Sequence, residues 1–174
     1  MKESSTLEIL SQQGFARAGL AIAIVSATAL AGAWFFQLVV GLAPCPLCLE
    51  QRIPYYAAIP LALIVVFVSI NASNKNTARW GLVLLSLVLA VGAGLGVYHA
   101  GVEWGFWPGP SDCSGTPSFA TGGNILNQMS KTRVVRCDEA AWRFLGISLA
   151  GYNALIAGVL ALYALGTASK KNPT

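Results

Sequence analysis

Four long apolar segments dominate this chain and limit it to a helical fold embedded in a membrane. A helix needs about 20 mostly apolar residues to cross the roughly 30 Å hydrocarbon layer of a bilayer. Only 10% of the 174 residues are charged, whereas soluble domains carry about 25%. The sequence predicts an all-α bundle of four transmembrane helices in a single membrane domain. The expected helices cover residues 18–40, 49–70, 80–101 and 145–168.

Two other interpretations of the apolar segments fit the sequence less well. Strands of an outer-membrane barrel would alternate apolar and polar residues, and these segments do not. The first segment is longer than the 7–15 apolar residues of a secretory signal core. Residues 42–45, Leu-Ala-Pro-Cys, faintly resemble a lipoprotein cleavage site, but a proline directly before the cysteine fits poorly. We therefore expect the first segment to remain as a transmembrane helix.

The basic residues predict the orientation of the bundle. The two tails and the middle loop share one face and carry six Lys or Arg, against five on the other face. This count gives a small margin under the positive-inside rule, and the middle loop, with two basic and no acidic residues, gives the stronger signal. We expect both termini in the cytoplasm and loops 41–48 and 102–144 on the opposite side. The net charge of +4 then reflects topology, and we expect no nucleic-acid binding.

All four cysteines fall in the two loops of the non-cytoplasmic face. Cys45 and Cys48 lie in the first loop, and Cys113 and Cys137 lie in the second. That compartment permits disulfides, and four cysteines allow three pairings between which the sequence does not choose. Two redox pairs on one face favour a relay, because thiol–disulfide exchange passes electrons between pairs that a flexible loop brings together. The alternative for the second pair is a structural disulfide that staples the loop.

The segment from Cys45 to Arg52 has the pattern of a helix start. Proline suits the first helical position, which makes Cys45 the N-cap and Pro46 the first helical residue. A helix N-terminus lowers the pKa of a thiol, because free N–H groups stabilise the thiolate. Cys48 and Arg52 are four residues apart and share a helix face. Arg52 stays charged, so it can hold a thiolate or a ligand oxygen that becomes negative on reduction.

Less reactive roles exist for the same residues. Cys45 and Cys48 would also suit a static disulfide or half of a zinc site, but zinc favours a second closely spaced pair, and Cys113 and Cys137 are 24 positions apart. We therefore expect no metal. Arg52 at a membrane edge is either functional or a snorkelling side chain.

Several other residues carry structural expectations. Prolines 54 and 60 are expected to interrupt and kink the second helix, and Gly92 and Gly96 to allow close helix packing. Aromatic residues at positions 104, 106 and 107 indicate an interfacial belt. A short amphipathic helix on the membrane surface is expected over residues 124–130. The chain contains no internal repeat and no separate soluble domain.

Two stretches resemble a known family. Residues 44–48, Pro-Cys-Pro-Leu-Cys, followed by Arg52, resemble the first-loop signature of the bacterial disulfide bond formation protein B (DsbB) family. Cys137 and then residues 142–148, Trp-Arg-Phe-Leu-Gly-Ile-Ser, resemble the family's sequence after its last cysteine. The four-helix layout and the two cysteine pairs extend the resemblance over nearly the whole chain.

The resemblance implies a quinone-dependent thiol oxidase of the bacterial inner membrane, with both cysteine loops in the periplasm. A periplasmic thioredoxin-fold dithiol oxidase of the DsbA type would form a mixed disulfide at Cys113. Cys137 would then be released, or held by Cys45 in a disulfide between the loops. The Cys45–Cys48 pair would pass electrons to a membrane quinone, ubiquinone or menaquinone, with Cys48 against the ring and Arg52 beside it.

Two further residues belong to the expected quinone site. His99 ends the third helix and would either hydrogen-bond a quinone carbonyl or simply lie at the interface. Leu149 stands where some members of the family carry a longer, sulfur-containing residue near the quinone, and leucine can also pack on a ring.

Two competing functions remain at this point. A relative of the vitamin K epoxide reductases would also combine four helices, a CxxC motif and a quinone, but there the CxxC follows the loop cysteines, and here it comes first. A redox-inert membrane scaffold with two structural disulfides is the second alternative.

Overall fold

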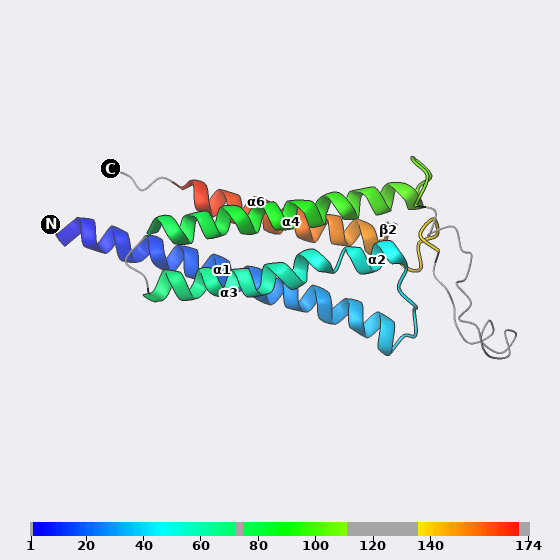
Figure 1. Ribbon diagram of the computed structural model, residues 1–174, viewed down its shortest axis with the longest axis horizontal. Coiled ribbons are helices and arrows are strands. Elements are labelled where there is room, and N and C mark those ends of the chain that lie inside the picture. The colour runs from blue at the N-terminus through cyan, green and yellow to red at the C-terminus, as the bar shows by residue number, and fades with distance from the viewer. Residues whose placement is uncertain (1, 72–74, 111–135, 171–174) are drawn as a thin grey trace, which may run out of the picture.

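The computed structural model describes residues 2–71, 75–110 and 136–170 as an elongated helical bundle (Figure 1). Within these residues, four stretches are long and apolar enough to cross a membrane, which confirms the predicted four-span fold. The stretches are Gln13–Leu38, Pro46–Asn71, Asn76–Glu103 and Leu149–Ser169. The elements in chain order are α1 (Lys2–Leu38), α2 (Pro46–Glu50), α3 (Ile53–Asn71), α4 (Lys75–Glu103), β1 (Arg143–Phe144), β2 (Ile147–Ser148) and α6 (Leu149–Ser169).

The two ends of the bundle differ in what they carry. Figure 1 shows the start of α1, the start of α4 and the end of α6 at one end, and α2 with the β1–β2 hairpin at the other. The first loop and residues 136–148 therefore lie at the same end, opposite the start of α1. This arrangement brings Cys45, Cys48 and Cys137 to one end of the molecule. Cys113 and the helix expected over residues 124–130 lie outside the described residues.

The second span is two helices joined at Gln51 and Arg52. The break precedes Pro54, whose ring would clash with the carbonyl of Glu50 if the helix continued without interruption. Pro54 then occupies the first turn of α3, a position that proline tolerates, and α3 continues through Pro60. The expected interruption therefore lies before Pro54, and Pro60 does not end the helix.

The fourth span begins later than the apolar pattern predicts. Residues 143–148, the first part of the expected helix among them, form an antiparallel hairpin in which Arg143 pairs with Ser148. Its turn residues Leu145 and Gly146 both have positive φ, as two-residue hairpins require. Ser148 then caps α6 by accepting a hydrogen bond of 3.2 Å from the Gly151 N–H. The helix consequently starts at Leu149 rather than at Leu145.

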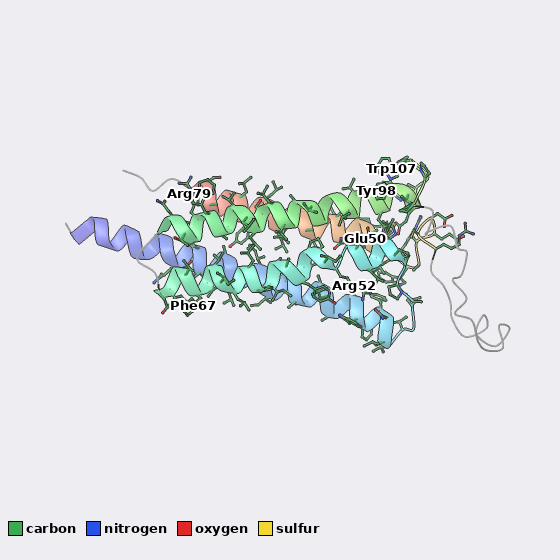
Figure 2. The ribbon with its side chains drawn as sticks, in the orientation of Figure 1. Glu50, Arg52, Phe67, Arg79, Tyr98 and Trp107 are labelled. Atoms are coloured by element: carbon green, nitrogen blue, oxygen red, sulfur yellow. The ribbon has the colours of Figure 1, made fainter. Side chains whose placement is uncertain are left out.

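Small residues bring the helices close together. A Cβ at Gly96 would lie 2.7 Å from the Ala154 nitrogen of α6, and a Cβ at Gly92 would lie 3.1 Å from Pro54 of α3. This confirms the packing role expected for the glycines of α4. Large apolar side chains such as Phe67 and Trp80 point outward and are mostly exposed, as Figure 2 shows for Phe67. Outward apolar side chains fit a lipid surround better than water.

The aromatic residues after α4 lie near the end that carries the cysteines. Trp104 and Phe106 are exposed, and the Trp107 indole donates a hydrogen bond of 2.9 Å to the Tyr98 carbonyl. The rings of Tyr98 and Trp107 are stacked, with their centroids 6.1 Å apart (Figure 2). Exposed aromatic rings at this position suit a membrane–water boundary.

Candidate active site

Cys45 and Cys48 start α2 in the expected way. Cys45 is the N-cap residue and Pro46 is the first helical residue, which confirms the predicted helix start. The Cys45 sulfur accepts a hydrogen bond of 3.1 Å from the Cys48 N–H. Both cysteines are free thiols. A scaffold held by two structural disulfides would require this pair to be bridged, so the free thiols count against that alternative.

The two thiols are not equivalent. The hydrogen bond between the two thiol side chains, followed by burial, raises the pKa of the Cys45 thiol above its ordinary value, although the Cys48 N–H acts in the opposite direction. The prediction of a lowered pKa is therefore wrong for Cys45, because the neighbouring sulfur and the loss of water outweigh the helix N-terminus. The protonated form of Cys45 is therefore favoured, and the two thiols differ in their surroundings.

Cys45 faces Cys137 across the first loop. The sulfurs of Cys45 and Cys137 and a ring nitrogen of His99 all lie within 4.8 Å of one another, and all three residues are buried. Cys137 is disulfide-bonded, and neither Cys45 nor Cys48 is its partner, since both are free. A sulfur in a disulfide is not a thiolate ligand, so the bonded Cys137 offers this trio no thiolate for a metal, and its distance from the Cys45 sulfur is short enough to be considered for thiol–disulfide exchange.

The segment around Cys137 turns its charges outward. Arg136 donates to both carboxylate oxygens of Asp138, at 2.7 and 3.0 Å, and this exposed ion pair lowers the pKa of the Asp138 carboxyl. Cys137 between them is completely buried, next to Cys45, Leu47 and Val102. The local chain thus points one sulfur into the protein and two charges toward solvent.

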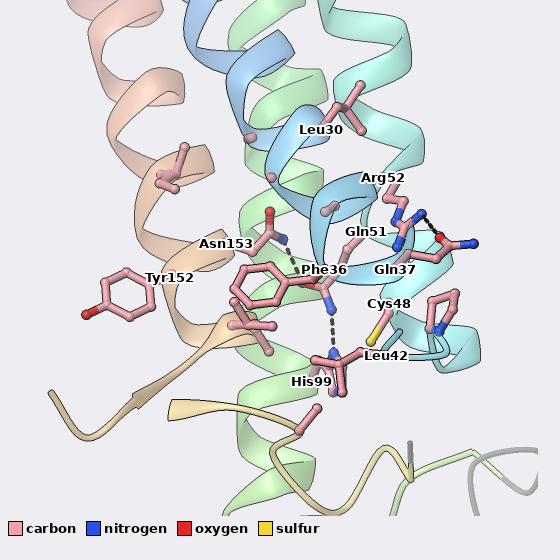
Figure 3. Close-up of a pocket in the computed structure, with 18 of the residues that line it drawn as sticks. Leu30, Phe36, Gln37, Leu42, Cys48, Gln51, Arg52, His99, Tyr152 and Asn153 are labelled. Carbon is pink, nitrogen blue, oxygen red and sulfur yellow. Dashed lines mark hydrogen bonds between the residues drawn. The ribbon is translucent and has the colours of Figure 1, made fainter. Parts of the chain in front are cut away.

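Arg52 points into the bundle and is held from two sides. It is only 8% exposed, and its guanidinium donates a hydrogen bond of 2.7 Å to the Gln37 side-chain oxygen of α1 (Figure 3). Its Cζ lies 5.4 Å from the centroid of the Trp34 ring, within cation–π range. The Trp34 N–H in turn donates to the Tyr56 hydroxyl at 3.0 Å. A snorkelling arginine would reach outward to the aqueous edge, and Arg52 does not.

A cavity of about 480 Å³ lies beside Cys48 and Arg52, between α1, the α2–α3 junction and α6 (Figure 3). Its volume falls in the range of about 300–1,000 Å³ that small-molecule sites occupy. Most of its wall is apolar, with a few polar groups at one end. Apolar lining residues include Val25, Ala29, Leu30, Ala33, Phe36, Leu149 and Ile156, and polar ones include Gln37, Cys48, Gln51, Arg52, His99, Glu103 and Asn153.

All residues expected at a quinone site border this cavity. Cys48, Arg52, His99 and Leu149 line it, and Cys45 does not. The two sulfurs of the CxxC motif therefore face different surroundings: Cys48 faces the cavity and Cys45 faces Cys137. Helix spacing predicted the common side of Cys48 and Arg52, and the structure brings these two residues together at the same end of the cavity.

Sequence reasoning missed a buried polar chain beside the cavity. Gln51 accepts a hydrogen bond of 2.6 Å from Asn153 of α6 and hydrogen-bonds His99 of α4. Glu103 lies one helical turn beyond His99, with 3.9 Å between the His99 Nε2 and a carboxylate oxygen. Its other oxygen is buried and has no hydrogen-bond partner among the described residues. The sequence did offer one indication of this chain: its members are polar residues inside or at the edge of apolar helices, where polar groups are rare.

These features define a four-span membrane protein with a free dithiol between the disulfide-bonded Cys137 and an apolar cavity. The sequence profile described as "Disulfide bond formation protein DsbB" matches residues 16–167. The chain therefore belongs to the DsbB family, whose established role is disulfide bond formation.

Individual relatives agree with this assignment. A disulfide bond formation protein B of Xanthomonas oryzae is 33% identical over 147 residues, which cover 81% of this chain and 83% of the relative. A protein of the same name from Xylella fastidiosa is 34% identical over 69% of this chain and 70% of the relative. An uncharacterized protein of Rickettsia prowazekii is 28% identical over 87% of this chain and 86% of the relative. No solved structure matches the chain significantly.

Proposed function

We propose that the protein is a thiol:quinone oxidoreductase that reoxidises a periplasmic dithiol oxidase. The observation that carries the proposal is the different surroundings of the two neighbouring CxxC sulfurs. Cys45 lies within 4.8 Å of the Cys137 sulfur, and Cys48 lines an apolar cavity with Arg52. A pair placed in this way can accept electrons from a protein disulfide on one side and release them to a lipid-soluble acceptor on the other.

The first exchange takes electrons from the partner. A reduced thioredoxin-fold dithiol oxidase of the DsbA type attacks Cys113, which lies outside the described residues, and the Cys113 bond to the second loop cysteine breaks. The partner's second thiol then resolves the mixed disulfide. The partner ends as a disulfide, and the loop pair, Cys113 and Cys137, ends as two thiols, so two electrons and two protons have moved.

The second exchange moves those electrons to the CxxC motif. The Cys137 thiolate attacks the Cys45 sulfur of an oxidised Cys45–Cys48 pair, so that a Cys45–Cys137 bond forms while the Cys45–Cys48 bond breaks. Cys48 leaves as a thiolate. Cys113 then attacks Cys137, which restores the loop disulfide and releases Cys45. The short distance between the Cys45 and Cys137 sulfurs supports this order of attack.

The third step reoxidises the CxxC motif. The Cys45–Cys48 dithiol is oxidised to a disulfide and gives two electrons and two protons to a quinone, which leaves as a quinol. Cys48 is the thiol that reaches the acceptor, since it lines the cavity. Arg52 supplies a fixed positive charge where a carbonyl oxygen gains electron density. Leu149 and the apolar wall would hold the ring. The acceptor would be ubiquinone or menaquinone.

The orientation follows from the charge distribution and the topology. The start of α1 and the end of α6 lie at the end opposite Cys45, Cys48 and Cys137, and α4 begins at the same end as the start of α1, next to the basic residues of the middle loop. We place the protein in the bacterial inner membrane, with both termini in the cytoplasm and the cysteines in the periplasm. Disulfide exchange requires such an oxidising compartment.

Quinone reduction by the purified, membrane-reconstituted protein tests this function. A reduced thioredoxin-fold dithiol oxidase supplies the electrons, and absorbance follows the conversion of ubiquinone or menaquinone. Cys48→Ser should abolish turnover, because serine cannot form a disulfide with Cys45. Full turnover by Cys48→Ser would contradict the proposal. Arg79→Ala changes a residue at the opposite end of the bundle. It is the control for loss of activity caused by purification and reconstitution of a variant.

A further inference from the structure

The two ring nitrogens of His99 have different neighbours: a side-chain amide lies beside one, and a sulfur and a carboxylate lie near the other. Its Nδ1 meets the side-chain amide nitrogen of Gln51 (Figure 3). Its Nε2 lies 3.8 Å from the Cys45 sulfur and 3.9 Å from a carboxylate oxygen of Glu103. A neutral imidazole carries one proton, and the environment decides which nitrogen holds it. The tautomer of His99 therefore depends on which atoms of Gln51 and Cys45 donate and accept.

A backbone carbonyl fixes the orientation of the Gln51 amide. The Gln51 Nε2 lies 3.3 Å from the Leu47 carbonyl oxygen, which can only accept a hydrogen bond. If the amide were flipped, two oxygens would face each other there. The Nε2 group must therefore be the NH₂ end, with one hydrogen for Leu47 and the second for His99. Asn153 completes the arrangement by donating to the Gln51 oxygen at 2.6 Å.

The donor from Gln51 leaves His99 Nδ1 as an acceptor. Nδ1 then has no proton, so the proton of the neutral ring sits on Nε2, which faces the Cys45 sulfur. The distance of 3.8 Å suits an N–H···S hydrogen bond because sulfur is large. The 3.9 Å to the Glu103 oxygen is too long for an N–H···O bond, whose usual range is about 2.7–3.2 Å. The backbone of Cys137 also lies within hydrogen-bonding reach of the ring.

We propose that Gln51 is a positioning residue that holds His99 as the Nε2–H tautomer, so that His99 stabilises Cys45 as a departing thiolate. This inference rests on the exchange between Cys45 and Cys137 described under the proposed function. When Cys113 attacks Cys137, the Cys45–Cys137 bond breaks and its electron pair stays on the Cys45 sulfur. The His99 N–H then donates to that sulfur. Cys45 subsequently takes a proton and becomes the thiol that the third step consumes.

Few groups near Cys45 could stabilise a negative charge on its sulfur. Arg52 lines the cavity with Cys48, and no contact joins it to Cys45 among the described residues. Glu103 contributes negative charge, which opposes a second anion, and Arg143 interacts with Glu103. The Cys48 N–H donates to the Cys45 sulfur at 3.1 Å, and within the described part of the chain the His99 ring adds a side-chain donor on that sulfur. A leaving thiolate departs faster when its negative charge is stabilised.

Nitrogen NMR on the intact protein reads the tautomer directly. His99 is the only histidine of the chain, so in a protein labelled with ¹⁵N-histidine all ring-nitrogen signals come from His99 and need no further assignment. The wild-type protein should show a protonated Nε2 and an unprotonated Nδ1. Gln51→Met should produce a mixture of tautomers, and Gln51→Glu should place a proton on Nδ1, because a carboxylate only accepts. Gln37→Met makes the same change beside Arg52 and should leave the His99 spectrum unaltered.

The pH dependence of Cys45 alkylation tests the effect on the sulfur. In a background with Cys48, Cys113 and Cys137 all replaced by serine, Cys45 is the only thiol. Adding Gln51→Met should move the midpoint of the alkylation rate upward by about one to two pH units, the size expected for losing a hydrogen bond to a charged group. His99→Phe should move it at least as far.

Two results would overturn the inference. One is a wild-type spectrum with the proton on Nδ1, and the other is an alkylation midpoint that neither Gln51→Met nor His99→Phe changes. Neither measurement contains quinone or partner protein. A failure of the proposed function would instead appear as absent quinone reduction with the His99 spectrum still as expected, so the two failures are distinguishable.

Discussion

Cys45 and Cys48 open the same helical turn but face different parts of the molecule. The Cys45 sulfur lies within 4.8 Å of the Cys137 sulfur, and Cys48 lines the cavity of about 480 Å³ that Arg52 also borders. The N-cap position of Cys45 produces this divergence, because an N-cap residue has extended backbone angles and Cys48 is already helical. One turn of chain thus connects a protein disulfide to an apolar cavity.

The divergence of the two sulfurs predicts which cysteines can be bridged. In a Cys48→Ala, Cys113→Ala double variant, mild oxidation should join Cys45 to Cys137, because their sulfurs already lie within 4.8 Å. The matched control, Cys45→Ala with Cys113→Ala, leaves Cys48 and Cys137 and should form little bridge. Non-reducing mass spectrometry measures both products. Equal amounts of disulfide in the two variants would contradict the finding that Cys45, and not Cys48, faces Cys137.

Replacing Arg52 should weaken quinone use more than thiol chemistry. Arg52→Met removes a charge-assisted hydrogen bond of about 1.5–3 kcal/mol, so the apparent KM for quinone should rise about tenfold or more. Arg52→Lys should lie between, since lysine keeps the charge but not the planar fork that bonds Gln37. Steady-state quinone reduction at varied quinone concentration measures the constant. Arg79→Ala is the control, and an unaltered KM in Arg52→Met would remove Arg52 from the site.

The sequence was sufficient for features set by local spacing. Apolar length predicted the four spans, and the proline after Cys45 predicted the helix start. Four-residue spacing predicted that Cys48 and Arg52 share a side. These features depend on residues that are close in the chain, so local geometry sets them, even though α2 ends at Glu50 and Arg52 lies in the turn before α3.

Other features depend on distant parts of the chain or on local turn geometry. The hairpin at residues 143–148 was hidden because its apolar residues continue into the apolar run of α6, and hydropathy does not separate a strand from a helix there. The signal was Gly146 followed by the capping Ser148. The link from Asn153 through Gln51 to His99 joins α6, the α2–α3 junction and α4, and no spacing rule within one helix predicts it.

Filling the cavity at Leu149 should exclude the quinone without affecting the thiols. Leu149→Trp places a larger ring against the Cys48 side of the cavity and should raise the apparent KM for quinone about tenfold, or 1.4 kcal/mol. Leu149→Met should be tolerated, because leucine and methionine have similar volumes. Leu155→Trp adds the same ring on an exposed, outward-facing position of α6 and is the control. Equal effects of Trp at both positions would argue against a quinone beside Leu149.

The close contact between α4 and α6 makes two neighbouring glycines respond differently to the same substitution. A Cβ at Gly96 would lie 2.7 Å from the Ala154 nitrogen and 2.8 Å from its Cα, and this backbone cannot yield without moving α6. A Cβ at Gly94 would have no atom within 4 Å beyond its own helix. Gly96→Ala should therefore destabilise the protein by about 1–3 kcal/mol, as overpacking does. Gly94→Ala should leave stability unchanged or raise it, since alanine favours helix. Thermal unfolding in detergent compares the two Tm values. A Gly96→Ala protein as stable as Gly94→Ala would show that α4 and α6 are not packed as closely as described.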